Sequence, residues 1–409
     1  MCGIIGYSGP KEPLPILING LSRLEYRGYD SAGIAISDGN KITVEKKEGK
    51  LEVLKNHLKD NNIKGNIGIG HTRWATHGVP NDVNAHPHSD NNEEFAIIHN
   101  GIIENYAEIK KDLLEEGFEF KSDTDTEVVA VELSRKWNGQ LLKTVTDVAK
   151  TLEGTYALVV TTTKEEGTIV AGRLMSPLVL GVGENEVFLA SDSAAILEHT
   201  NKMIFLENGD FVEIKNGQYK LFDSELNEIE REIQEIDWEV SEAEKLGHDH
   251  FMYKEILEQS EVIERTISGR IESTSKEIPI KQDEASKYEK IWIVACGTAY
   301  HAGLFGKDLF EKVLGVPVSV ELASEFRYRE PIVGENDLGI VISQSGETMD
   351  TIAATELLKE NGAHVLALVN VVGSSLARMA DSVFYLHVGP EIGVASTLSL
   401  IHISEPTRH

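Results

Sequence analysis

The chain has 409 residues, a length that suggests two or three domains and is ample for well-buried cores. Its 41% hydrophobic and 26% charged residues are typical of a globular protein rather than a disordered one. The 39 basic and 67 acidic residues give a formal net charge of −28, which disfavours nucleic acid and anionic membranes as partners. No apolar run reaches about 18 residues, the N-terminus lacks a signal-peptide pattern and there are two cysteines, so we expect a cytoplasmic protein with reduced thiols.

Short apolar runs bounded by Gly, Asp, Asn or Ser predict a series of strands in the first half of the chain. These runs lie at 33–37, 67–70, 95–101, 156–162, 168–172, 178–183 and 187–191. Helical periodicity predicts helices at 13–25, 104–116 and 126–137. Strands flanked by helices without strict alternation predict an α+β layered domain over residues 1–218.

A strongly acidic segment follows this domain. Between Asp223 and Lys245 the sequence holds ten carboxylates and two basic residues, which is typical of a solvated surface segment. Together with a helical pattern at 250–270 it predicts an acidic connector and helical linker over 219–285. From residue 286 strands and helices alternate, which indicates an α/β domain with a parallel sheet.

Cys2 carries the first chemical signal. It follows the initiator methionine and precedes Gly3, and a small second residue is the usual condition for removal of Met1. The mature chain would then begin with a cysteine that has both a thiol and a free α-amine. Because the pKa of such an amine is about 7.7–8.0, it can act as the base for its own thiol.

Six segments of the chain, the first of which starts at Cys2, resemble those of the class II, or N-terminal-nucleophile, glutamine amidotransferases in their order and spacing. They are CGIIG (2–6), LEYRGYDSAG (24–33), GHTRWATHG (70–78), NAHPH (84–88), HNGIIEN (99–105) and SDTDTE (122–127). The resemblance implies the layered N-terminal-nucleophile fold and makes Cys2 the nucleophile.

Glutamine hydrolysis suits the residues of these segments. Attack on the amide creates an oxyanion, for which the Asn100 side chain and the Gly101 backbone N–H are suitable donors. Arg73 offers a fork for the α-carboxylate of glutamine, and Asp125 offers a carboxylate for the α-ammonium. Taken singly, an Asn-Gly pair is also typical of a type I′ turn and an arginine of a surface ion pair, but the ordered set favours the functional interpretation.

The resemblance assigns further roles around Arg73. It makes the loop of Arg73, Trp74, Ala75, Thr76 and His77 a lid that closes over glutamine, with Trp74 as the gate to an ammonia path.

Five histidines within 30 residues also suggest a metal site. The ligand spacing is incomplete, and the resemblance favours hydrogen-bonding and packing roles, so no metal is expected. These histidines are His71, His77, His86, His88 and His99.

SQSGET (343–348) is the strongest signal of the second half, because it ends a predicted strand and opens a helix. Hydroxyls of Ser343, Ser345 and Thr348 around a helix N-terminus predict a phosphate cradle, although a serine N-cap is the simpler alternative. A second strand-to-helix loop, CGTAY (296–300), offers Thr298. The two loops resemble those of a sugar isomerase (SIS) domain with a flavodoxin-like sheet, here incomplete over 286–397.

Three more segments extend the resemblance to the glutamine–fructose-6-phosphate aminotransferase (glucosamine-6-phosphate synthase) family. They are ELASEFRYR (321–329), GSSLAR (373–378) and EIGVAST (391–397). The resemblance implies transfer of the amide nitrogen of L-glutamine to D-fructose 6-phosphate, giving D-glucosamine 6-phosphate and L-glutamate without any cofactor. It adds Gln344, Val394 and Ser396 to the sugar site, and it implies a homodimer for the full-length protein.

The resemblance ends at Thr397, and residues 398–409 (LSLIHISEPTRH) match no family pattern. No residue of the sequence can be assigned as the isomerase acid/base, the ring-opening histidine or the Schiff-base lysine of the family. We therefore expect at most glutaminase chemistry from the chain as given. Two alternatives are a phosphosugar-binding SIS protein without synthase activity and another class II amidotransferase. The second is disfavoured because the ATP-binding and phosphoribosyl-binding loops of the other classes are not found.

Overall fold

The computed structural model describes residues 2–25, 28–59, 61, 63–75, 77–236, 248, 250–267, 287–389, 391–393 and 396. The chain forms two compact units, Met1–Asp237 and Trp238–His409.

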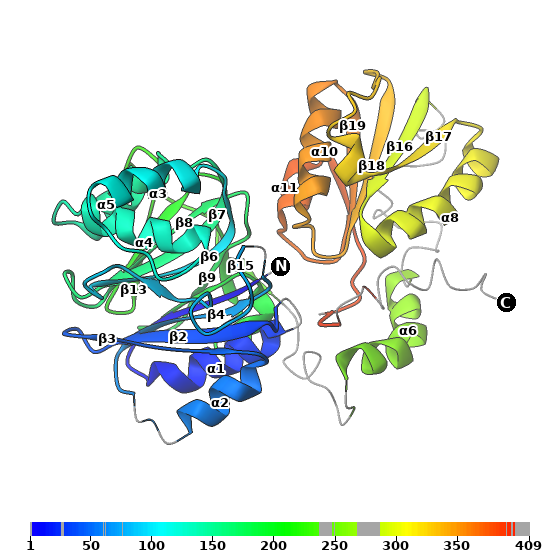
Figure 1. Ribbon diagram of the computed structural model, residues 1–409. Coiled ribbons are helices and arrows are strands. Elements are labelled where there is room, and N and C mark those ends of the chain that lie inside the picture. Colours follow the sequence, from blue (N-terminus) through cyan, green and yellow to red (C-terminus); the bar gives the residue numbers. More distant parts are fainter. Residues whose placement is uncertain are drawn as a thin grey trace. The chain divides into compact units, whose positions relative to one another are not determined.

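Two antiparallel sheets form the centre of the first unit (Figure 1). The strands of one sheet are β1 (Gly3–Ser8), β2 (Ser31–Ser37), β3 (Ile42–Glu48), β4 (Ile67–Arg73), β9 (Val179–Val182), β10 (Val187–Ala190), β11 (Lys202–Phe205) and β15 (Gln234–Glu235), in the order β15-β11-β9-β10-β1-β4-β2-β3. Those of the other are β5 (His88–Ser89), β6 (Phe95–Ile103), β7 (Gly154–Thr162), β8 (Thr168–Leu174), β12 (Phe211–Lys215), β13 (Gln218–Phe222) and β14 (Glu228–Ile229), in the order β14-β13-β12-β8-β7-β6-β5.

Helices cover the outer face of each sheet (Figure 1). The eight-stranded sheet carries α1 (Pro13–Leu24) and α2 (Leu51–Leu58), and the seven-stranded sheet carries α4 (Asp125–Arg135) and α5 (Leu141–Ala149), with α3 (Tyr106–Glu115) against α4. A short 3₁₀ helix, η2 (Ser193–Ala195), contacts α1. The resulting helix–sheet–sheet–helix layering confirms the predicted α+β fold.

The alternation of side chains along the central strands explains why they read as continuous apolar runs. In β6, Ala96 and Ile98 face the core between the sheets, whereas Phe95 and Ile97 face α4 and α5. Because successive side chains of a strand point to opposite faces, a strand buried on both faces needs apolar residues at nearly every position.

The first unit extends beyond the expected boundary at residue 218. Part of the expected connector forms β13, β14 and β15, which pair with strands of the two sheets. Strands β14 and β15 are two-residue edge strands, each with one exposed glutamate, so their composition resembles that of a linker. Residues 237–247, 249 and 268–285 of the expected connector lie outside the described residues.

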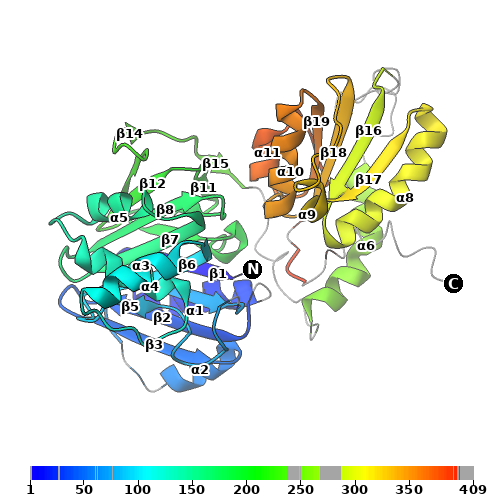
Figure 2. The same cartoon turned by 45° about the horizontal axis from the view of Figure 1, so that its top comes forward.

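The second unit contains a five-stranded parallel sheet (Figure 2). Its strands are β16 (Lys290–Ala295), β17 (Val318–Leu322), β18 (Asp337–Ser343), β19 (His364–Val369) and β20 (Ser382–Tyr385), in the order β17-β16-β18-β19-β20. The helices between them are α8 (Gly297–Leu314), α9 (Ala323–Phe326), α10 (Met349–Glu360) and α11 (Ser375–Met379). Numbered along the chain, the strand order is 2-1-3-4-5, which confirms the predicted flavodoxin-like sheet.

One more helix, α6 (Phe251–Ile267), belongs to this unit and agrees with the helix expected at 250–270. Its Val262 packs with Leu386 and Val388, which follow β20. The carboxylate of Glu255 on α6 accepts hydrogen bonds from the backbone N–H groups of Ile392 (2.7 Å) and Gly393 (2.8 Å). Helix α6 therefore holds the segment that follows the last described strand.

A substitution at Leu189 of β10 tests the core between the two sheets of the first unit, because this side chain is fully buried there. We expect Leu189→Ala to lower the free energy of unfolding by about 2–5 kcal/mol, since it removes buried methyl groups and leaves a cavity. Urea denaturation measures the change. Leu114→Ala on α3, where the side chain is 53% exposed, is the control and should shift the free energy by less than about 0.5 kcal/mol. Equal losses in the two variants would contradict this description of the core.

Candidate functional site

Cys2 lies at the start of β1, beside the end of β4. Strands β1 and β4 are antiparallel with Gly3 opposite Thr72, so Cys2 is placed next to Arg73 and Trp74. The Trp74 backbone N–H donates to Cys2 Sγ at 3.2 Å, and Sγ lies 3.6 Å from the Trp74 carbonyl oxygen. Gly3 permits this approach, because a Cβ there would lie 2.6 Å from Thr72 Oγ1. The main chain at the end of β4 thus fixes the thiol.

Asn100 approaches Cys2 from the other sheet. It is 8% exposed near the end of β6, and its Nδ2 donates to the Cys2 carbonyl oxygen at 3.0 Å. On its other side Asn100 Oδ1 lies 3.0 Å from His71 Nε2. The two predicted partners, nucleophile and amide donor, are therefore brought together.

Gly101 occupies a backbone conformation that requires glycine. Its φ is 126°, and a Cβ at this position would clash with the carbonyl oxygen of Thr155 on the neighbouring strand. Gly101 pairs with Tyr156 within the β6–β7 ladder, as Asn100 pairs with Ala157. The alternative that Asn100-Gly101 forms a hairpin turn is therefore wrong, because both residues lie inside a long strand.

Arg73 is buried at the end of β4, with 4% of its surface exposed. Its Nη2 donates to the carbonyl oxygens of His77 and Gly78, whereas its buried Nη1 has no hydrogen-bond partner among the described residues. Burial lowers the pKa of Arg73, and the neighbouring Cys2 and Asp125 oppose that shift. Arg73 is thus not a surface ion pair, and one buried guanidinium N–H group is available to an anion.

Asp125 is the first residue of α4 and is 5% exposed. One carboxylate oxygen accepts the backbone N–H of Ile103 at 2.9 Å, which ties α4 to the end of β6. A capping interaction holds this helix start, since the Thr124 side chain accepts the backbone N–H of Glu127 at 3.4 Å. The Thr-x-x-Glu spacing is a capping-box signal that could have been read from the sequence.

The expected lid is partly described. Trp74 is 41% exposed, and its ring lies edge-on to that of Tyr29 at 5.3 Å between centroids. The backbone N–H of Ala75 donates to Asp30 Oδ2 at 2.8 Å, so Asp30 anchors the loop. No role was predicted for Asp30 from the sequence, although it lies within the LEYRGYDSAG segment. Thr76 lies outside the described residues, and the lid function stays a prediction.

Four of the five clustered histidines are buried behind Asn100. The His71 and His86 rings lie 4.2 Å apart between centroids, and those of His86 and His88 lie 4.8 Å apart. His99 Nδ1 lies 2.9 Å from Thr126 Oγ1. Burial lowers the pKa of His71 to about 3 and those of His86, His88 and His99 below their usual value, so these rings are neutral near pH 7. The fifth, His77, lies edge-on to Tyr106 at 5.6 Å between centroids.

The SQSGET loop of the second unit lies between β18 and α10. Ser343 Oγ lies 3.0 Å from Thr348 Oγ1 and accepts the backbone N–H of Gly346 at 3.1 Å. Ser345 Oγ accepts the backbone N–H of Glu347 at 3.2 Å. Helix α10 begins after Thr348, with no side-chain capping hydrogen bond, so the loop is not a serine N-cap. The three predicted hydroxyl residues therefore share one turn before a helix.

Of the other residues predicted to bind the sugar, Gln344, Thr298 and Ser396 are described and Val394 is not. Gln344 is held by the Asn370 backbone N–H, which donates to its carbonyl oxygen at 3.0 Å. Thr298 lies in the first turn of α8, which follows β16, and β16 is the parallel neighbour of β18. Both loops therefore follow the carboxyl ends of adjacent strands. Ser396 is described, but Val394 lies outside the described residues, so their place in this site stays a prediction.

Two findings concern the described part of the chain as a whole. Within it, no three or more His, Cys, Asp or Glu side chains are grouped so that they could hold a metal ion. Its helices include none with the length and apolar character needed to cross a membrane.

Known proteins match the two units separately and together. A glutamine amidotransferase domain family matches residues 56–247, and the SIS domain family matches residues 285–404, past the expected limit at 397. The structure of a glutamine phosphoribosylpyrophosphate amidotransferase from B. subtilis has a TM-score of 0.51 at 18% identity and covers 98% of this chain and 95% of that one. At that identity it supports the fold alone. The fold and these matches define a class II glutamine amidotransferase unit joined to a SIS unit.

Full-length relatives specify the family within this class. The chain is 50% identical over 405 residues to the glutamine–fructose-6-phosphate aminotransferase (isomerizing) of Clostridium perfringens, covering 98% of this chain and 66% of the relative. It is 47% identical over 397 residues to the same enzyme of Aquifex aeolicus, with 97% and 66% covered. The chain belongs to the glutamine–fructose-6-phosphate aminotransferase family, and it spans 66% of the length of these relatives.

The buried histidines predict a loss of stability in mild acid. The unfolded chain protonates a histidine near pH 6.5, whereas the folded pKa of His71 is about 3, so the unfolded state binds more protons between these values. Stability that is complete above about pH 6.5 is therefore lost as the pH falls, by about 2 kcal/mol for His71 alone at pH 5. Urea denaturation at pH 7.5 and 5.0 measures the loss, which His71→Asn should reduce. Equal stability of the wild type at the two pH values would contradict the assignment of neutral buried rings.

Proposed function

We propose that this chain carries the glutamine-hydrolysing and sugar-phosphate-binding parts of a glutamine–fructose-6-phosphate aminotransferase. The whole protein would transfer the amide nitrogen of L-glutamine to D-fructose 6-phosphate, giving D-glucosamine 6-phosphate and L-glutamate. The convergence of Cys2, Asn100 and Arg73 from two sheets carries this proposal, and the family of the chain supplies the acceptor.

Glutamine hydrolysis begins at Cys2 once Met1 has been removed. The α-amine takes the thiol proton, and Sγ attacks the side-chain amide carbon of glutamine. The negative charge that forms on the amide oxygen is stabilised by the Asn100 side chain and the Gly101 backbone N–H. Collapse of this adduct breaks the carbon–nitrogen bond and releases ammonia, with the proton returned through the α-amine. Water then hydrolyses the γ-glutamyl thioester to glutamate and restores the thiol.

Arg73 and Asp125 would bind the amino-acid end of glutamine. The buried Nη1 of Arg73, which has no hydrogen-bond partner in the described part of the chain, suits the α-carboxylate, and burial strengthens such a charge-assisted pair. The Asp125 carboxylate suits the α-ammonium group. Trp74, Thr76 and His77 would form the lid, with Trp74 as the gate toward the ammonia path.

The second unit would bind fructose 6-phosphate at the carboxyl ends of β16 and β18. Ligands of open α/β sheets bind where the strand order reverses, and these two strands lie at that point. The hydroxyls of Ser343, Ser345 and Thr348, at the start of α10, suit a phosphate. Gln344, Thr298, Val394 and Ser396 complete the proposed sugar site.

The surroundings of the whole protein follow from the same proposal. We propose a cytoplasmic homodimer that acts on small molecules and not on nucleic acid. The formal net charge of −28 disfavours nucleic acid as a partner, because it repels polyanions while leaving a local phosphate site intact.

The reaction is tested by incubating the chain with glutamine, with and without fructose 6-phosphate, and measuring glutamate and glucosamine 6-phosphate. We expect glutamate release by the wild type and at least a thousandfold loss in Cys2→Ala, which lacks the nucleophile. Cys296→Ser, at the other cysteine, should keep the wild-type rate. Undiminished glutamate release by Cys2→Ala would remove Cys2 as the nucleophile. Glucosamine 6-phosphate formation would show that the chain also performs the sugar half.

Arg73→Lys tests the glutamine site. Lysine keeps a positive charge but loses the planar fork, so we expect KM for glutamine to rise at least tenfold, with a smaller change in kcat. Arg23→Lys is a matched control, because Arg23 pairs with Glu198 and is not part of the proposed site, and its KM should stay within twofold. Steady-state kinetics of glutamate release measure both constants. An unchanged KM in Arg73→Lys would rule out Arg73 as the carboxylate ligand.

A further inference from the structure

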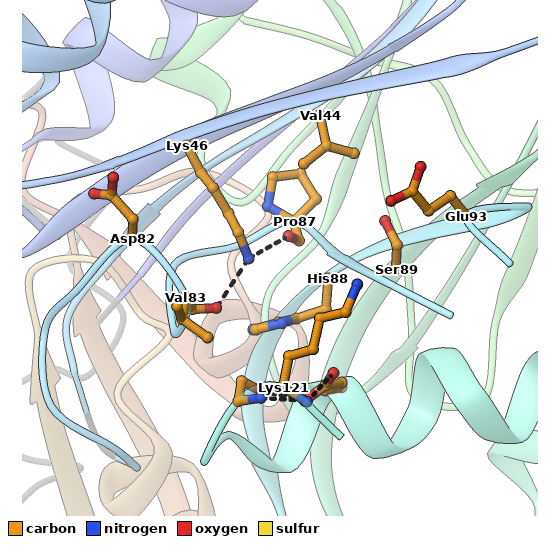
Figure 3. A pocket seen from close by; sticks show the side chains of 11 residues that line it. Val44, Lys46, Asp82, Val83, Pro87, His88, Ser89, Glu93 and Lys121 are labelled. Atoms are coloured by element: carbon orange, nitrogen blue, oxygen red, sulfur yellow. Dashed lines mark hydrogen bonds between the residues drawn. The ribbon is translucent and has the colours of Figure 1, made fainter. Parts of the chain in front are cut away.

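The NAHPH segment takes no part in the proposed chemistry, yet carbonyl oxygens of this segment and of the residue before it accept hydrogen bonds from one lysine. Lys46 of β3 extends toward the loop of residues 83–88 (Figure 3). Its Nζ donates to the carbonyl oxygens of Val83 at 2.9 Å, Ala85 at 2.8 Å and Pro87 at 3.2 Å. An ammonium group has three N–H donors, so all three are used on one loop.

Lys46 lines a cavity of about 370 Å³, together with His88 and Glu127. Burial lowers the pKa of Lys46 to about 8, and the carboxylates of Glu127 and Asp82 oppose this shift. The three carbonyl oxygens require the charged form, because a neutral amine has two N–H groups. The ammonium group of Lys46 thus binds the backbone carbonyls of a loop and not a carboxylate among the described residues.

The loop in turn places His86 against His71. The carbonyls of Ala85 and Pro87, on either side of His86, both accept from Lys46. The loop also rests closely on β2, because a Cβ at Gly33 would clash with the His86 carbonyl oxygen. The His86 ring then lies 4.2 Å from that of His71.

His71 determines which way the amide of Asn100 is turned. Its Nε2 lies 3.1 Å from the His99 carbonyl oxygen and 3.0 Å from Asn100 Oδ1. Both neighbours are acceptors, so the hydrogen-bond network assigns the ring proton to Nε2. Asn100 then presents its oxygen to His71 and its nitrogen to Cys2, the orientation an oxyanion donor requires.

We propose that Lys46 is a positioning residue for glutamine hydrolysis. Its ammonium group holds the 83–88 loop so that His86 packs on His71, and His71 keeps the Asn100 nitrogen directed at the nucleophile. Lys46 acts through this chain of contacts rather than by contact with substrate. The inference rests on the proposed roles of Cys2 and Asn100.

The test compares Lys46→Met with Lys47→Met on the same strand. Methionine keeps the length of the side chain but removes its N–H donors. Lys47 is a matched control because it pairs with Asp82 of the same surface at 2.8 Å, where such pairs contribute little. We expect kcat for glutamate release to fall at least tenfold in Lys46→Met, with KM for glutamine within twofold. Both constants should stay within twofold in Lys47→Met.

A second readout separates positioning from a general weakening of the fold. Iodoacetamide alkylates the Cys2 thiol without an oxyanion, whereas a diazoketone analogue of glutamine reacts through its carbonyl group. In Lys46→Met the rate of inactivation by the diazoketone should fall in parallel with kcat, and alkylation by iodoacetamide should keep its wild-type rate. Equal losses in both rates would overturn the proposal in favour of a disturbed thiol.

A double variant tests whether Lys46 acts on catalysis through Asn100. Because Lys46 acts on the same amide, Lys46→Met combined with Asn100→Ala should lower kcat no further than Asn100→Ala alone. Multiplied losses would overturn the proposal. If Lys46→Met does not fold, Lys46→Gln, which retains two N–H donors, takes its place with a smaller expected loss. A wild type without glutaminase activity would instead refute the proposed function, and an active wild type with fully active Lys46 variants would refute this inference alone.

Discussion

The hydrogen bond from Asn100 Nδ2 to the Cys2 carbonyl oxygen joins two sheets that share a large apolar core. His71 adds a second polar contact between them, because its Nε2 lies 3.0 Å from Asn100 Oδ1. Cys2 precedes β1, which β4 and β10 flank on both sides, and Asn100 lies in β6, which is fixed by its long ladder with β7. Neither residue can shift without moving a central strand. The geometry of the proposed hydrolytic site is therefore set by the packing of the two sheets.

Maintaining this site requires buried polar groups that a simple core would exclude. Nδ1 atoms of His71 and His86, like Nη1 of Arg73, are buried without a hydrogen-bond partner among the described residues. Each such group carries a desolvation cost of about 1–3 kcal/mol. The large apolar clusters on both faces of the seven-stranded sheet offset these costs. Arg73 interacts electrostatically with Cys2 and Asp125, so the proposed substrate carboxylate would satisfy its Nη1.

The phosphate site proposed for the second unit is compatible with the strongly acidic character of the chain. Its proposed site uses hydroxyls and a helix N-terminus rather than a basic patch, so the repulsion from a net charge of −28 acts at long range and is screened by salt. The positions of these groups follow from the parallel sheet, because adjacent strands end at the same edge. Gly346 permits the turn, since its φ is 65° and a Cβ would clash with Ser374 Oγ.

Much of the fold could be predicted because apolar runs such as 95–101 and 156–162 are buried on both faces. The helices α1, α3, α4 and α6 also carry a clear periodic pattern. Elements with mixed composition were missed: β3 is rich in lysine and glutamate, α5 contains several β-branched residues, and the edge strands β14 and β15 resemble a linker. Their identity depends on the strands and helices beside them, which no local pattern records.

The sequence by itself determined the candidate chemistry of this protein, because a cysteine behind Met1, an Asn-Gly pair and a Ser-rich turn before a helix each require particular residue types. It also determined the two-part organisation. Only the tertiary structure decided that Asn100-Gly101 lies in a strand rather than a turn, that Arg73 is buried, and that Lys46 holds the loop beside His71. These facts depend on contacts between residues distant in the chain, and such contacts form only when the two sheets pack.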